Sequence, residues 1–287
     1  MRPILKELLD LLGLEPIEVN LFRGQSQDLG WGAVYGGQVL GQALSAAART
    51  VPADRGVHSL HGYFLRQGDA RKPILYQVDR IRDGKSFTTR RVVAVQAGEP
   101  IFSLAASFQV DEPGLDHQAP APVDVPPPES LRTDWEAAAD WATTLPEPFA
   151  SRAMAERPIE MRSVDVVHPF APEVRAPVRR VWLRTPDPLP DDPALHRYLL
   201  AYASDFHLLT TALFPHGVSF VSPGLHIASL DHAMWFHRPF RIDDWLLHVI
   251  DSPSASGSRG LVRGQFFDRA GRLVASSAQE GLMRRRP

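Results

Sequence analysis

Apolar and polar positions in the first third of the chain change from a helical period to an alternating one. The segment 38–50 is rich in Ala, Leu and Gln, its apolar residues recur at the helical period, and Pro52 ends it. Asp83-Gly84 marks a tight turn within the stretch that follows. One helix followed by long meandering strands predicts an antiparallel sheet packed on a single helix. The predicted strands, rich in β-branched and aromatic residues, lie at 57–65, 74–82, 87–96 and 101–110.

The second half repeats this plan. An alternating strand at 178–184 and a loop at 186–193 precede a long apolar helix. We place this helix at 194–213, because Pro215-His216-Gly217 ends it. The strands predicted after it lie at 225–236, 245–251, 261–267 and 273–283.

Two short sequence matches strengthen the repeat. Ser59 and Gln109 bound the first strand-rich stretch, and Ser229 and Gln279 bound the second at an offset of 170 residues without a net gap. The stretches close as LAASFQ and VASSAQ. We therefore expect one fold made twice, in which polar residues that differ between the copies become candidates for chemistry. The two sheets are expected to join edge to edge into one continuous sheet.

Proline content divides the two copies. Six prolines fall within 113–128, with almost no apolar periodicity, which is typical of an extended linker. A surface helix is expected at 131–145, and a short N-terminal helix, with apolar positions from 4 to 12, is expected to end at Gly13. The chain is therefore predicted to consist of an N-terminal unit at 1–112, a linker at 113–158 and a C-terminal unit at 159–287.

Composition narrows the function classes. The 287 residues carry a net charge of −2, so no basic surplus points to nucleic acid. The absence of cysteine excludes disulfides, thiolate catalysis and Cys-ligated metals, and it fits a reducing compartment. The N-terminal segment is not expected to be a secretory signal, because charged residues interrupt its apolar run. No apolar run approaches the ~20 residues that span a bilayer. A cytoplasmic protein without a membrane span is expected.

Longer motifs resemble one known family. They are LFRGQSQDLG, VYGGQVLGQAL, VHSLHGYFLRQGD and IRDGKSF in the first half, and YASDFHLL, PGLHIASLDHAMWFHRPFRIDDWLL, RGLVRGQFF and VASSAQEGLMR in the second. Together they resemble the acyl-CoA thioesterase II family over nearly the whole chain. SLDHAMWFHRPF carries most weight, because it is long and rich in rare residue types. The resemblance implies an α+β double hotdog fold, in which two tandem units each wrap a long helix with an antiparallel sheet.

The resemblance also implies an activity and a site. Members of the family hydrolyse acyl-CoA to free fatty acid and CoA, and an Asp, a hydroxyl residue and a Gln orient the attacking water. Asp205, Ser229 and Gln279 occupy the matching positions in YASDF, ASLDH and SSAQEG. The family commonly carries Thr where this chain has Ser229. The hydroxyl is retained, whereas the lost methyl leaves the rotamer less restricted.

The residue types agree with an activated water. No GxSxG motif and no cysteine is present, so a carboxylate that activates water is a simpler mechanism than a nucleophilic elbow. Each residue also has a structural alternative. Asp205 lies in an apolar helical segment and is either exposed or satisfied by a strand, Ser229 is of a type that is usually structural, and Gln279 suits backbone pairing. The helix at 38–50 has no acidic counterpart of Asp205, so one active centre per chain is expected.

Other candidates lie near the ends of elements. Gly36 and Gly37 precede a helix, where they either expose backbone N–H groups to substrate or form a loop with unusual dihedral angles. His58 either binds substrate or packs at the seam between the units. Asp231 and His232 are adjacent on a strand, so both side chains enter one site only if a bulge intervenes.

We therefore expect an acyl-CoA thioesterase of fatty acid metabolism, with acyl-CoA as its partner and no cofactor. No metal is expected, because the histidine pairs lack a third ligand. A homo-oligomer, either a dimer or a tetramer, is expected because a broad half-polar sheet favours further pairing. Two rivals stay open. One is a hotdog-fold enoyl-CoA hydratase or dehydratase, in which His58 or His232 would be critical, and the other is a non-catalytic acyl-CoA-binding protein.

Overall fold

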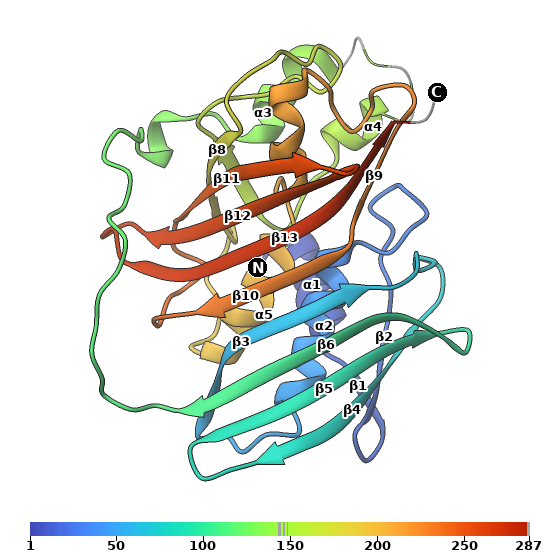
Figure 1. Ribbon diagram of the computed structural model, residues 1–287, viewed down its shortest axis with the longest axis vertical. Coiled ribbons are helices and arrows are strands. Elements are labelled where there is room, and N and C mark those ends of the chain that lie inside the picture. The colour runs from blue at the N-terminus through green and yellow to red at the C-terminus, as the bar shows by residue number, and fades with distance from the viewer. Residues whose placement is uncertain (143–144, 146, 148, 286–287) are drawn as a thin grey trace.

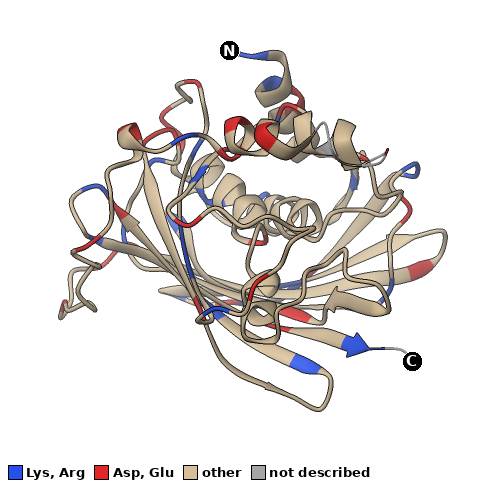
Figure 2. Cartoon of the chain, turned by 90° about the horizontal axis from the view of Figure 1, so that it is seen from above, with Lys and Arg blue, Asp and Glu red and all other residues tan. Residues whose placement is uncertain are grey.

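The computed structural model describes the chain except for residues 143, 144, 146, 148, 286 and 287. In the described part, thirteen strands form one sheet that curves around the central helices (Figures 1 and 2). β9 (Leu225–Ser229) lies off the main path and pairs with β13. The other strands, in spatial order, are β1 (Glu15–Glu18), β2 (Leu21–Gly24), β4 (Ile74–Asp83), β5 (Phe87–Gln96), β6 (Glu99–Val110), β3 (Arg55–Phe64), β10 (Asp231–Phe236), β13 (Leu273–Arg285), β12 (Arg259–Asp268), β11 (Leu246–Ser256), β8 (Val178–Arg184) and β7 (Glu160–Ser163).

The join between the halves is the antiparallel pair β3–β10, in which Ser59 lies opposite Trp235 and His61 opposite Ala233. The expectation that two sheets meet edge to edge is confirmed. The strands of the first half also lie within a few residues of their predicted positions. Because the sheet is continuous across β3 and β10, elements from both halves can contribute to one site on its inner face.

Two long helices lie on that inner face, one from each half: α2 (Gly36–Ala48) and α5 (Pro193–Ser204). Asp192 caps the start of α5, and its carboxylate accepts the Ala194 N–H at 2.9 Å. α2 carries small residues toward α5, and a Cβ at Gly41 would lie 3.1 Å from the Tyr198 carbonyl oxygen. The two helices therefore pack backbone to backbone at the centre of the molecule.

The helix expected at 194–213 is wrong beyond Ser204. His207 has a φ of 63°, a left-handed conformation that an α-helix of L-residues does not continue. The His207 carbonyl instead accepts the hydroxyls of Thr210 and Thr211 at 2.9 and 3.0 Å, at the start of the 3₁₀ helix η2 (Leu209–His216). This break leaves Asp205 at the end of α5.

The single strand expected at 225–236 is interrupted by a bulge at Leu230, which separates β9 from β10. Ser229 lies opposite Gly281, and Ala233 lies opposite Ala278. The segment that contains β9 and β10 therefore has one more residue between these two pairs than β13 has. Asp231 accepts the Glu280 N–H at 2.6 Å in the bulge. Because of the extra residue, Ser229 and His232 both face inward.

The linker is packed against the outer face of the second half. Pro126 accepts the indole N–H of Trp182 at 2.9 Å, and the apolar cluster around Trp182 includes Val125 and Leu131 of the linker. The predicted surface helix is α3 (Asp134–Ala142), and residues 143 and 144 of its expected range lie outside the described residues.

The N-terminal helix is confirmed as α1 (Pro3–Leu12). None of the helices in the described ranges has the length and apolarity needed to cross a membrane. Five short elements escaped prediction, because runs of three to six residues show too little periodicity. They are β1, β2, β7, the 3₁₀ helix η1 (Pro128–Ser130) and α4 (Phe149–Met154).

Candidate active site

Asp205 occupies the residue position immediately after α5, where the chain leaves the helix. Its side chain is only 8% exposed, and its carboxylate accepts the backbone N–H of Gly37 at the start of α2. A Cβ at Gly36 would lie 2.7 Å from Asp205 Oδ2, so only glycine leaves room for the carboxylate there. The carboxylate of the second half is therefore held by a helix N-terminus of the first half.

Gln279 holds the same carboxylate from the sheet. It lies on the inner face of β13 with 1% of its surface exposed, and its Nε2 donates to Asp205 Oδ1 at 2.8 Å. The same nitrogen lies 3.2 Å from His232 Nδ1. Asp205, Gln279 and His232 thus form one contiguous buried polar group.

Burial raises the pKa of Asp205, while the hydrogen bonds from the Gln279 amide and the Gly37 N–H act in the opposite direction. The position of the carboxylate at the C-terminal end of α5 also disfavours its charge. A buried carboxylate with a raised pKa is a stronger base once ionised than an exposed one, and this property is typical of a general base.

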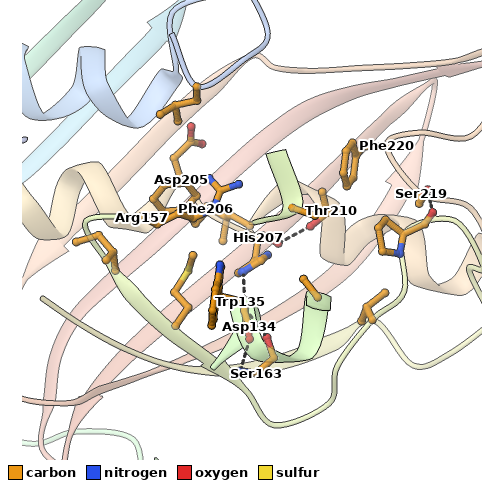
Figure 3. Close-up of a pocket in the computed structure, with 18 of the residues that line it drawn as sticks. Asp134, Trp135, Arg157, Ser163, Asp205, Phe206, His207, Thr210, Ser219 and Phe220 are labelled. Atoms are coloured by element: carbon orange, nitrogen blue, oxygen red, sulfur yellow. Dashed lines mark hydrogen bonds and ion pairs between the residues drawn. The ribbon is translucent and has the colours of Figure 1, made fainter. Parts of the chain in front are cut away.

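A cavity of about 1270 Å³ opens beside Asp205 and Ser229. Residues of α3, α4 and η2 close it on the side away from α2. Its lining includes many aromatic side chains, which suit an apolar ligand. Among them are Trp31, Phe149 and Phe214. Trp135, Phe206 and Phe220 also line it (Figure 3).

A second polar group anchors the linker at this cavity. Asp134 at the start of α3 accepts the Ser163 N–H at 2.7 Å and lies 3.3 Å from His207 Nε2 (Figure 3). Although burial opposes ionisation, the bonds from His207 and Ser163 keep the pKa of Asp134 below its ordinary value. The ionised carboxylate therefore ties α3 to the turn that follows Asp205.

Two family models match the chain. The model of the acyl-CoA thioesterase N-terminal domain matches residues 26–109, and the acyl-CoA thioesterase model matches residues 149–282. Acyl-CoA thioesterase 2 of Haemophilus influenzae is 44% identical and covers 99% of this chain and 99% of its own. The chain belongs to the acyl-CoA thioesterase family. Within this thioesterase family, acyl-coenzyme A thioesterase 8 of Homo sapiens is 43% identical, covering 96% of this chain and 88% of its own.

Solved thioesterase structures share the fold. An acyl-CoA thioesterase II from Mycobacterium marinum has a TM-score of 0.79 and 44% identity, covering 97% of this chain and 98% of its own. A hot dog fold protein from Alicyclobacillus acidocaldarius, at 20% identity and a TM-score of 0.77, supports the fold alone. The expected α+β double hotdog is confirmed.

The thioesterase structure brings together some of the predicted site residues and not others. Asp205 and Gln279 are directly bonded, and Ser229 and Gly36 line the same cavity as Asp205. His58 does not lie with them: its Nε2 is 2.8 Å from Ser107 Oγ, on the outer face of β3 and β6.

The sequence repeat pairs Ser59 and Gln109 with Ser229 and Gln279, but the thioesterase's two units do not place these pairs alike. Leu60 and Phe108 are in the core, so their neighbours Ser59 and Gln109 point outward, whereas Gln279 points inward. The first-half pair is therefore no structural twin of Ser229 and Gln279.

Sequence reasoning also missed several residues of the thioesterase cavity. Asp134 and His207 line the cavity but were not predicted. His207 could have been found, because it lies within the YASDFHLL motif two residues after Asp205. Arg179 was missed because it falls in a strand with no motif; it is buried, with its guanidinium 4.8 Å from the Phe214 ring centroid. In the described ranges, no three His, Asp or Glu side chains gather to hold a metal ion.

Proposed function

We propose that this chain hydrolyses acyl-CoA thioesters to free fatty acid and CoA. The observation that carries the proposal is the buried Asp205 carboxylate, bonded to Gln279 at 2.8 Å and open to a large cavity lined by aromatic side chains. The relatives at 43–44% identity over nearly the whole chain, which bear the name acyl-CoA thioesterase, support the same reaction.

The mechanism we infer uses a water molecule rather than a covalent intermediate. Asp205 takes a proton from water as the water oxygen bonds to the thioester carbonyl carbon. The C–S bond then breaks, and the proton held by Asp205 passes to the departing CoA sulfur. Ser229 and Gln279 hold the water, since a hydroxyl both donates and accepts hydrogen bonds and the amide oxygen is an acceptor. Neither a metal nor a cofactor takes part in these reaction steps.

The cavity suits the acyl group of the substrate. Its volume of about 1270 Å³ exceeds the ~300–1,000 Å³ common for small-ligand pockets, and aromatic rings form much of its wall. The acyl chain enters it with the thioester carbonyl beside Asp205 and Ser229. Gly36 at the cavity wall lets the α2 backbone approach the reacting group, which supports Gly36 as a substrate-side residue, whereas the Gly37 N–H is bonded to Asp205.

Free-thiol release from acyl-CoAs of increasing chain length tests the proposal, with wild type and Asp205→Asn side by side. The variant should lose about 10³-fold in kcat, because it retains the shape but not the base. Asp192→Asn is the matched control: it lies at the other end of α5, and asparagine keeps the cap acceptor for the Ala194 N–H. No thiol release by wild type, or equal release by the Asp205 variant, would contradict the proposal.

A hydratase or dehydratase is the second candidate, because His232 Nδ1 lies 4.0 Å from Asp205 Oδ1 and thus places a histidine and a carboxylate in one site. Both ring nitrogens of His232 already contact polar partners, Ser204 and Gln279. Burial also lowers the pKa of His232 to about 4, so the ring is neutral at neutral pH and is not an imidazolium acid. A hydrated acyl-CoA formed without free thiol would favour this candidate.

The chain is also proposed to form a cytoplasmic homo-oligomer, a dimer or a tetramer. Support comes from the outer face of the first half, where Tyr63, Leu75 and Ile81 are exposed, whereas the linker covers part of the outer face of the second half. The absence of cysteine suits the cytoplasm. Light scattering that gives the mass of a single chain would contradict the oligomer.

A further inference from the structure

A chain of hydrogen bonds runs from α5 through the sheet to the carboxylate. It joins the Ala201 carbonyl, Ser204, His232, Gln279 and Asp205. We propose that Ser204 and His232 are positioning residues, which fix the end of the Gln279 amide that faces Asp205. This inference rests on the proposed thioesterase reaction, to which it assigns two further residues that do not touch the substrate.

Ser204 determines which groups donate and which accept along this series of hydrogen bonds. Ser204 Oγ lies 2.9 Å from the Ala201 carbonyl oxygen, which can only accept, so the single hydroxyl proton points there. Ser204 Oγ also lies 3.0 Å from His232 Nε2 and must accept in that contact. The proton of the neutral imidazole therefore resides on Nε2, and Nδ1 carries a lone pair.

The histidine in turn orients the amide. The Nδ1 lone pair needs a donor, and the Gln279 side-chain nitrogen at 3.2 Å provides one. The second N–H of that nitrogen goes to Asp205 Oδ1 at 2.8 Å. This orientation turns Gln279 Oε1 away from Asp205, and the oxygen is buried without a hydrogen-bond partner among the described residues.

The imidazole stays neutral because of its surroundings. Its side chain is fully buried, and burial lowers its pKa to about 4. The titratable groups near it are Asp205 at the end of α5, Asp231 on its own strand and His248 on β11. A neutral ring with a fixed tautomer can specify the orientation of a neighbouring amide, as a charged ring with two donors cannot.

The opposite tautomer would reverse the amide. With a proton on Nδ1, Gln279 would present Oε1 to His232, and the same oxygen would then face the Asp205 carboxylate. Asp205 would lose an N–H donor and gain a repulsive contact, and both changes raise its pKa further. This series of hydrogen bonds therefore serves the proposed base by stabilising the ionised form of Asp205.

His232→Leu, which removes the Nδ1 acceptor, tests the inference. We expect kcat to fall about 10–100-fold with little change in KM, and the acidic limb of kcat/KM to move to higher pH. His232→Asn should recover much of the activity, because its side-chain oxygen can occupy the Nδ1 position. Ser204→Ala should shift the limb in the same direction, and Ser204→Thr, which keeps the hydroxyl, should not.

A matched control separates positioning from folding. Ser45→Ala removes a buried hydroxyl of α2 that donates to the Leu12 carbonyl at 3.0 Å, far along the helix from Gly36. It should leave the pH profile unchanged. A fall in kcat without a shifted limb in the His232 and Ser204 variants, or an equal loss in the control, would overturn the inference.

The tautomer can also be read without activity. The ¹⁵N chemical shifts of the His232 ring in the wild-type protein should show the Nε2–H form at neutral pH. An Nδ1–H form would overturn the inference even if the enzyme releases thiol. An Nε2–H form in a protein that releases no thiol would instead refute only the proposed function.

Discussion

The two units differ most on the inner face of their central strands. In the first unit, Leu60 of β3 lies opposite Ala106 of β6, and both are buried and apolar. In the second unit, His232 of β10 contacts Gln279 of β13, and both are buried and polar. The same arrangement of strands thus carries an apolar core in the first unit and a buried polar group in the second. The first unit nevertheless contributes Gly36 and Gly37, which hold Asp205 from the opposite side.

This difference shows what a repeat can and cannot reveal. Side chains alternate across a strand, so a shift of one residue moves a position to the other face of the sheet. Ser59 and Gln109 match Ser229 and Gln279 in spacing but point outward. The repeat therefore indicates the fold correctly and the location of the first unit's polar residues wrongly.

Gln279→Ala, which copies Ala106 of the first unit, should have the largest effect of the changes that test this comparison. It removes the N–H donor to Asp205 and the amide that is proposed to hold the water, so we expect kcat to fall about 10²–10³-fold. The pKa of Asp205 should rise as well, because the amide hydrogen bond lowers it.

Steady-state kinetics across a pH series checks both effects. The base must be ionised, so activity is lost as pH falls through the pKa of Asp205, and a higher pKa moves that loss to higher pH. Gln109→Ala on the outer face of the first unit is the matched control and should leave kcat unchanged. A limb that stays in place in the Gln279 variant would contradict the assignment of Asp205 as the base.

Gly37→Ala should show that the first unit is needed for the site of the second. A Cβ at this position collides with the Tyr202 carbonyl of α5, whose backbone cannot move aside easily. We expect a loss of about 1–3 kcal/mol in the free energy of unfolding, together with reduced kcat as α2 withdraws from Asp205.

Chemical denaturation and thiol release measure the two losses for Gly37→Ala. Gly114→Ala is the control, since a Cβ there meets nothing within 4 Å. Full stability and activity of the Gly37 variant would mean that the close contact between α2 and α5 is dispensable.

Much of the fold could be predicted from the sequence, because long periodic segments have distinct patterns. The strands at 74–82 and 87–96 and the helix at 38–50 were placed within a few residues of β4, β5 and α2. The end of α5 was not predicted, because the left-handed backbone of His207 leaves an apolar helical pattern intact on both sides. Tertiary contacts, not local preference, determine that break.

The candidate site was predicted less completely, for a related reason. Asp205, Ser229 and Gln279 were found through family motifs, and their residue types alone left structural alternatives. The role of His232 depends on the bulge at Leu230, which brings Ser229 and His232 to the same face. No pattern of apolar positions encodes a single extra residue in a strand, so only the folded structure reveals that Ser229 and His232 share a face.

Ser229→Ala and Ser59→Ala compare the loss of one hydroxyl in each unit, and we expect smaller effects on kcat than for Gln279→Ala. Ser229 lines the cavity with Asp205, so loss of its hydroxyl should lower kcat about 10-fold, whereas loss of the Ser59 hydroxyl on the outer face should leave kcat unchanged. Ser229→Thr should stay within about threefold of wild type, because it keeps the hydroxyl and restricts the rotamer. Thiol release by the three variants under identical conditions would test this, and equal losses at positions 59 and 229 would contradict it.

His58→Ala should have the smallest effect. His58 contacts Ser107 at 2.8 Å and the Phe87 ring on the outer face, and burial lowers its pKa, so it is a neutral packing residue at neutral pH. We expect kcat/KM within about twofold of wild type and a loss of stability near 1 kcal/mol, as for one hydrogen bond. Ser107→Ala, which removes the partner, should behave alike. A loss above tenfold in kcat/KM with stability unchanged would instead place the outer face of the first unit in the reaction. In a homo-oligomer, that face could reach a substrate bound to a second copy, and mixing His58→Ala with Asp205→Asn would then restore part of the activity.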